Sequence, residues 1–198
     1  MNARAIMACL VLLLAGSSAY AAQPDDFDTH PDVFKGRDDQ AAAMIRIFQA
    51  ACMKTDGGPT GVHVWADRWK LKPLPDNDVK DLLSAPGGKG WQLGRFETPY
   101  YVTITPQSEC SVWAETADTV EVNEWFGKLM IGADGLEGLS ADLYHDAPLE
   151  TRDGPARLII YRYDLPEGPV SALFLAQTWE LESAPIKARL TRALVRKE

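Results

Sequence analysis

One short stretch rich in tryptophan carries the residue types best suited to chemistry or to binding. It places His63 and Asp67 four residues apart, with Trp65, Arg68 and Trp69 around them. A histidine beside a carboxylate can supply acid and base catalysis, and tryptophan and arginine are favoured at binding surfaces. The pattern therefore indicates a candidate binding surface made of these five residues. An alternative stays open, in which Trp65 and Trp69, one helical turn apart, simply pack on the hydrophobic core.

The rest of the sequence lacks the motifs of well-marked enzyme classes. It has no Gly-x-Ser-x-Gly elbow, Ser-x-x-Lys, His-Glu-x-x-His or Cys-x-x-Cys motif, no phosphate-binding glycine loop and no EF-hand calcium loop. Two groupings, His63 with Asp67 and His145 with Asp142 and Asp146, have the donor types that suit zinc, but such groupings arise by chance in an acidic chain. We therefore assign no catalytic residue and no metal ligand, and we expect no cofactor.

The cysteines predict one disulfide bond. Cys9 lies in the expected export signal, which leaves Cys52 and Cys110 in a compartment that permits disulfides. Closing a loop of this length would stabilise the fold by about 4 kcal/mol on the chain-entropy model. The functional alternative is a nucleophilic Cys52 with His63 as its base. It is disfavoured because a free thiolate beside a second cysteine would be oxidised in such a compartment.

The amino terminus has the three parts of a secretory signal peptide. Arg4 is followed by an apolar run over residues 5–15 and a small-residue stretch that ends at Ala21. The run is shorter than the roughly twenty residues that span a membrane, so we expect no membrane insertion after cleavage. Cys9 loosely matches a lipidation box but lies inside the apolar run. The sequence thus predicts a signal peptide over residues 1–21 and a soluble periplasmic, or secreted, product.

The mature chain is acidic. Without residues 1–21 it keeps 19 basic and 28 acidic residues, which leaves a formal charge of −9. An acidic surface repels phosphate backbones and anionic lipid headgroups, so it argues against nucleic-acid and membrane-surface binding. The charge favours a cationic protein as a partner, although it also serves solubility alone.

Periodicity predicts one α+β domain over residues 39–198, preceded by a flexible leader over residues 22–38. Helical spacing of apolar residues is expected in three segments, with Asp76 capping the second and a capping box at Asp118 and Glu121 starting the third. These helices cover residues 39–53, 76–83 and 118–130. Strands are expected over residues 101–105, 110–114, 139–144, 156–164, 170–181 and 186–195. The last of them also fits a helix, and we choose the strand. The result is an antiparallel meander with helices packed on one face and a disulfide that ties the first helix to the sheet.

Several short motifs give the chain a family resemblance. They are Phe48-x-x-x-Cys52, Trp91, Cys110-x-Val112-x-Ala114 and the late Ala184-Pro185-Ile186. Together they resemble small exported two-cysteine proteobacterial proteins and lipoproteins of unassigned function. The resemblance implies a periplasmic two-cysteine domain and transfers no catalytic residue.

Two functional hypotheses follow from these observations. The first is a periplasmic binding or interaction protein, for example an inhibitor or immunity-type partner of a cationic protein. The second is a periplasmic hydrolase that uses a site around His63 and Asp67. The sequence does not determine the oligomeric state.

Overall fold

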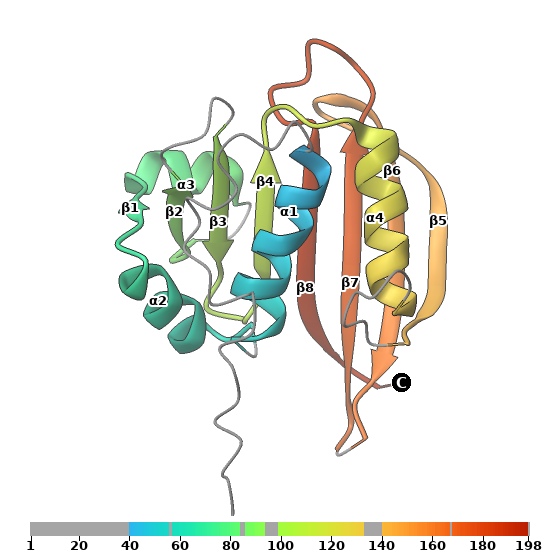
Figure 1. Cartoon of the computed structure of the whole chain (residues 1–198), viewed down its shortest axis with the longest axis horizontal. Helices are drawn as coiled ribbons and strands as arrows, with labels where there is room; N and C mark the ends of the chain where they lie inside the picture. The colour runs from blue at the N-terminus through green and yellow to red at the C-terminus, as the bar shows by residue number, and fades with distance from the viewer. Residues whose placement is uncertain are drawn as a thin grey trace, which may run out of the picture.

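The structure of this chain is a computed structural model that describes residues 40–55, 57–83, 86–93, 99–132, 140–166 and 168–197. The expected signal peptide and leader lie outside these residues. The described residues form α-helices, one π-helical segment and a single β-sheet whose strands differ in length (Figure 1). No helix among them is long and apolar enough to cross a membrane.

All strands of the described chain belong to one antiparallel sheet, in the order β1-β2-β3-β4-β8-β7-β6-β5. The bounds are β1 Lys72–Pro73, β2 Lys89–Leu93, β3 Tyr100–Ile104, β4 Cys110–Ala114, β5 Asp142–Thr151, β6 Gly154–Asp164, β7 Val170–Trp179 and β8 Ala188–Arg196. The last four strands form the expected meander. The strand choice for the final segment is confirmed, and β8 pairs with both β7 and β4, which joins the two halves of the sheet.

The helices are α1 Gln40–Phe48, α2 Pro59–Arg68, α3 Asp76–Leu82 and α4 Thr119–Ile131, with the π-helical segment η3 Gln49–Met53 directly after α1. The side chain of Asp118 caps α4 by accepting the amide hydrogens of Val120 and Glu121, as its spacing predicts. The expectation that Asp76 caps α3 is wrong. Pro75 is the N-cap residue, and Asp76 lies in the first turn, where a carboxylate still interacts favourably with the helix dipole.

The main core lies between the sheet and the pair of helices α1 and α4. Phe48 of α1 meets Phe126 of α4 edge to face, with ring centroids 6.3 Å apart, and Phe126 meets Tyr161 of β6 in the same way at 5.8 Å. Alternate residues of β4, among them Val112, are fully buried against these helices. Side chains of alternating strand residues point to opposite faces, so these contacts define the helix-covered face of the sheet.

The disulfide between Cys52 and Cys110 is present and fully buried, which confirms the prediction. It joins η3, at the end of the first helix, to β4 across 58 positions of sequence. The Cα atoms are 5.5 Å apart, within the usual range for a disulfide. The expectation of an α+β fold with one disulfide tying helix to sheet is therefore confirmed.

A smaller cluster lies on the other face of the sheet. Val79 and Leu83, in and just after α3, pack on Trp113 of β4. Trp113 alternates with the core residue Val112, so its side chain points away from α1 and α4. Helix α3 also contacts β2, and its Asp81 carbonyl accepts a hydrogen bond of 3.5 Å from Arg152 in the β5–β6 turn.

Candidate functional site

The five residues of the predicted binding surface lie on or just after helix α2. His63 and Asp67 share one face of the helix, with Nε2 of His63 3.7 Å from Oδ2 of Asp67, and both side chains are more than half exposed. The ring of His63 also meets Trp91 of β2 edge to face, with centroids 5.4 Å apart. This pair is therefore available to a partner on an exposed helix surface.

The remaining members of this surface divide between the core and the solvent. Trp65 packs partly against the main core, and its buried indole nitrogen has no hydrogen-bond partner among the described residues. Arg68 is exposed and lies over the ring of Trp69, 5.2 Å from its centroid. The structure thus brings His63 and Asp67 together but turns Trp65 inwards. The binding surface and the hydrolase hypothesis built on it stay predictions.

A groove lies elsewhere, between the first turns of α4 and the hairpin of β5 and β6. This cavity, of about 340 Å³, is bounded by Asn123 and Glu124 from α4 and by Asp146, Arg157 and Glu180 from the sheet side. A second cavity of about 450 Å³ adjoins it and shares Asp146, Arg157 and Glu180. We call the region around these three shared residues, on the side that faces α4, the acidic groove.

Antiparallel pairing explains why these side chains meet. Asp146 of β5 lies opposite Ile159 of β6, and the neighbouring pair is Pro148 with Arg157. Residues two apart on a strand point to the same face, so Asp146 and Arg157 share the helix-covered face. A bulge between Leu143 and His145 shifts the register and sets which β5 residues reach the groove.

A bidentate ion pair between Arg157 and Asp146 lies at the centre of the groove. Nε and Nη2 of Arg157 donate to Oδ1 and Oδ2 of Asp146 at 2.9 and 2.8 Å. Hydrogen bonds from the guanidinium hold the pKa of the Asp146 carboxyl below its usual value, and the same bonds raise the pKa of Arg157. Burial raises the pKa of Tyr161, and the Asp146 charge adds to the rise. The tyrosine hydroxyl on the groove wall is therefore protonated at neutral pH and can donate a hydrogen bond.

The charges of the groove do not cancel. Asp146 is neutralised by Arg157, and Glu124 is paired with Lys128 one turn later on α4, with an N–O distance of 2.8 Å. Glu180 also faces Arg157 and raises its pKa, but it makes no ion pair within the described part of the chain. One carboxylate of the groove therefore remains available for a positively charged group.

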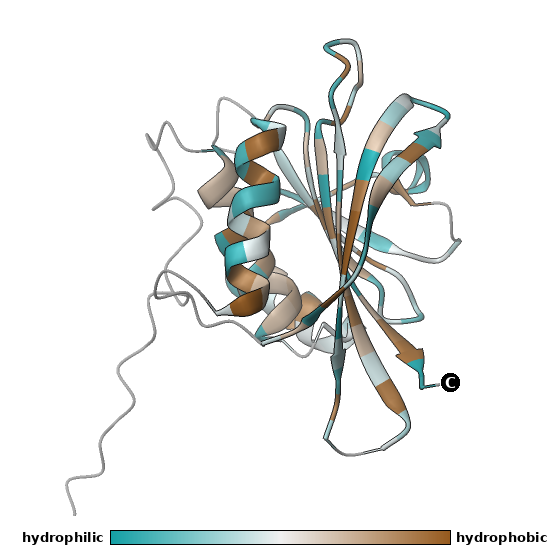
Figure 2. Ribbon diagram, turned by 90° about the vertical axis from the view of Figure 1, so that its right-hand side faces the viewer, coloured by the Kyte–Doolittle hydropathy of each residue, from teal (hydrophilic) through white to brown (hydrophobic). Residues whose placement is uncertain are grey.

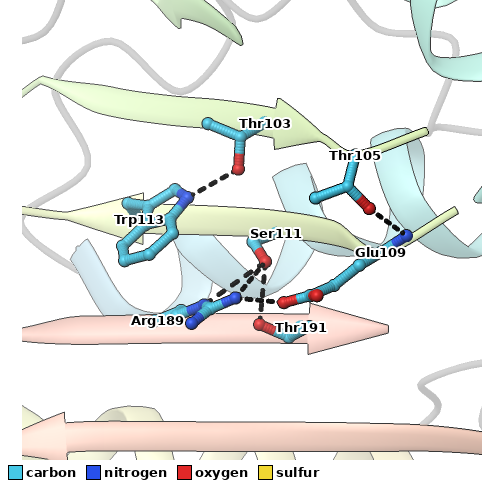
Figure 3. Close-up of polar contacts among 7 residues, drawn as sticks. All are labelled: Thr103, Thr105, Glu109, Ser111, Trp113, Arg189 and Thr191. Atoms are coloured by element: carbon cyan, nitrogen blue, oxygen red, sulfur yellow. Dashed lines mark hydrogen bonds and ion pairs between the residues drawn. The ribbon is translucent and has the colours of Figure 1, made fainter. Parts of the chain in front are cut away.

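A polar network on the opposite face of the sheet joins β4 to β8 (Figure 3). Arg189 pairs with Glu109, donates to Oγ of Ser111 at 3.3 Å, and lies 4.4 Å from the ring centroid of Trp113. Ser111 and Thr191 share a hydrogen bond of 2.8 Å. Burial lowers the pKa of Arg189, and Glu109 opposes that effect. Each of these side chains finds a partner within the network, so we regard it as a structural connection between the two halves of the sheet.

Of the three central residues of the groove, the sequence singles out only Asp146. Asp146 has the donor type of a zinc ligand beside His145, but the two neighbours point to opposite faces of β5, and no group of metal-ligating side chains occurs among the described residues. Arg157 and Glu180 were missed. Their charges gave no signal in an acidic chain, because only the β5–β6 register and the end of β7 bring them together.

Comparison with known proteins adds no relatives. No protein-family model matches the chain, and neither the curated proteins nor the solved structures include a match. The resemblance to small exported two-cysteine proteins stays a prediction.

Proposed function

We propose that this chain is an exported periplasmic or secreted binding protein whose acidic groove receives a basic segment of a cationic protein. An inhibitor or immunity-type partner of such a protein fits this description. The observation that carries the proposal is the groove itself, a depression lined by three carboxylates and one arginine in a chain with a formal charge of −8. A net negative charge in a cleft steers a positively charged partner towards it.

Apolar side chains around the groove support a protein partner over a small ion. Val120 on the first turn of α4 is 73% exposed and Leu143 of β5 is 57% exposed, and both line the groove. Large apolar side chains that gather in one exposed area are typical of protein interaction sites. A segment with a lysine or arginine next to apolar residues would match both the carboxylates and this rim.

The edge strand β5 is poorly suited to pair through its backbone with a strand of the partner. β5 is an edge strand, but it carries a bulge between Leu143 and His145 and a proline at position 148. Bulges and prolines at an edge interrupt the row of free backbone groups that another strand would pair with. We therefore place recognition in the side chains of the groove.

A binding titration with a defined probe tests the proposal. The probe is a synthetic peptide in which lysines alternate with leucines, and the variant is Glu180→Gln. Asp76→Asn, on exposed α3, is the matched control because it removes one carboxylate far from the groove. We expect the peptide to bind the wild type and the control equally, to dissociate as salt rises, and to bind Glu180→Gln about threefold or more weakly.

Two outcomes would contradict the proposal. If the peptide does not bind at low salt, the chain has no site for basic segments. If Glu180→Gln and Asp76→Asn weaken binding equally, attraction comes from the total charge and the groove is not the site. Pull-downs from the periplasm at low salt, with wild type and Glu180→Gln as paired baits, would then extend the test to natural partners.

A further inference from the structure

Away from the β5–β6 turn, the face of the sheet opposite α1 and α4 is bare over strands β5 to β8. Figure 2 shows the two long helices gathered on one side of the sheet. Helix α3 packs on Trp113 of β4, and its Asp81 carbonyl accepts a hydrogen bond from Arg152 in the β5–β6 turn. The segment after β7 covers the same end of the hairpin, where Ala184 packs on Trp179 and Ala156. Within the described part of the chain, no other element covers this face.

The bare face is apolar where a face in water would be polar. Cross-strand pairing places Ile160 of β6 beside Leu175 of β7, and Leu173 of β7 beside Ala193 of β8. All four are only partly buried. Antiparallel sheets with one solvated face normally alternate apolar inside with polar outside. The centre of the second face is apolar here, which favours a partner that covers it.

The balance of charges on this face favours a second copy of the chain over a cationic partner. Within strands β5 to β8 its charged side chains are Asp142, Arg162, Asp164 and Arg189, two acidic and two basic, while the whole chain carries −8. Arg162 is bonded to Asp164 at 2.9 Å, and Arg189 is paired with Glu109. A cationic partner would find no excess negative charge on this face. Two copies of an acidic chain, however, repel each other least where the face has no net charge.

The face is comparable in size to one side of a dimer interface. Four strands of nine to eleven residues cover at most about 30 Å by 19 Å, or roughly 600 Å² in projection, given about 3.3 Å per residue and 4.8 Å between strands. The end at Trp179 is already covered by Ala184. A standard interface buries about 800 Å² of accessible surface on each partner, and the surface of side chains exceeds their projection. A twofold axis would place the same apolar patch on both sides of the interface.

We propose that the bare face of strands β5 to β8 is the interface of a homodimer, in which the apolar patch around Ile160, Leu173 and Leu175 packs on the same patch of a second copy. This arrangement leaves the acidic groove free, because the groove lies on the helix-covered side of the same strands. It does not depend on the proposed binding of a basic segment.

The test is the solution mass of the exported chain, measured by sedimentation velocity at low and at high salt. We expect a dimer at both, since apolar burial is not weakened by salt. Leu175→Arg should raise the dissociation constant about tenfold or more, because it desolvates like charges across the interface, while unfolding stays cooperative. Val64→Arg, at an apolar residue 62% exposed on α2, is the matched control and should remain dimeric.

Each other result overturns the proposal. A monomeric wild type at the highest soluble concentration does so directly, and so does a dimer that Leu175→Arg leaves intact. A wild type that becomes dimeric only after removal of residues 22–38 would show that the leader occupies the face instead. Should Leu175→Arg not unfold cooperatively, Ala193→Glu, which adds a charge at a small side chain on the edge of the patch, takes its place with the same expected outcome.

Discussion

Breaking the disulfide is the perturbation whose magnitude can be worked out most directly. Cys52 and Cys110 are fully buried and lie 58 positions apart. Releasing the link gives the unfolded chain the entropy of that loop, which costs the fold about 4 kcal/mol on the chain-entropy model. With a urea dependence of about 2 kcal/mol per molar for a domain of this size, the unfolding midpoint should fall by about 2 M.

The assay compares three forms of the protein by urea unfolding, followed by the fluorescence of its tryptophans. The oxidised and the reduced wild type contain the same side chains, so their difference measures the loop contribution alone. The double variant Cys52→Ala with Cys110→Ala adds the loss of two buried sulfur atoms and should be less stable still. Because both cysteines are fully buried, reductant should act on the native protein only as fast as the protein unfolds.

One result would refute this reasoning. If the oxidised and reduced wild types unfold at the same urea concentration, the unfolded chain is already restricted near this loop, and the link does not stabilise the fold by entropy. A reduced form that is unfolded without urea would instead show that the disulfide supplies most of the stability of the domain.

Three further predictions concern single side chains. Asp118→Ala should destabilise the protein by about 1 kcal/mol because α4 loses its N-cap, and Asp118→Asn should restore most of that loss in thermal unfolding. Arg157→Gln should raise the pKa of Asp146 towards its ordinary value, as followed by NMR titration, and an unchanged pKa would contradict the role of the ion pair. Burial, followed by the hydrogen bond to Glu115, raises the pKa of Tyr101 to about 12. Its stabilising contribution should therefore be complete below about pH 10, the usual value in an unfolded chain, and be lost as the pH rises towards 12, with Glu115→Gln lowering the pKa in an ultraviolet titration.

Local sequence signals predicted most of the elements of this fold. The apolar spacing of the segments that became α1 and α4 is strong because each helix buries one continuous face. Helix α2 was not predicted from apolar spacing, since only Val62 and Ala66 among its ten residues are buried. Strand β5 extends far beyond the expected residue 144, because its exposed edge position leaves it almost no buried residue to mark it.

The acidic groove could not be predicted in the same way. Its residues come from three regions, and each is an ordinary surface charge on its own. Asp146 and Arg157 meet through the register of a hairpin with a bulge, and Glu180 reaches them from the end of β7. The bare apolar face likewise depends on which strands lie side by side, which alternation along one strand does not specify.

The sequence by itself therefore determined the acidic charge, the pairing of two cysteines and the α+β class, because composition and local periodicity are properties of the chain alone. Tertiary structure decided that β8 joins the two halves of the sheet, that His63 and Asp67 lie on an exposed helix, and where the charges converge. These depend on pairing between distant segments, and the free energy that selects one register over another comes from burial across the whole sheet.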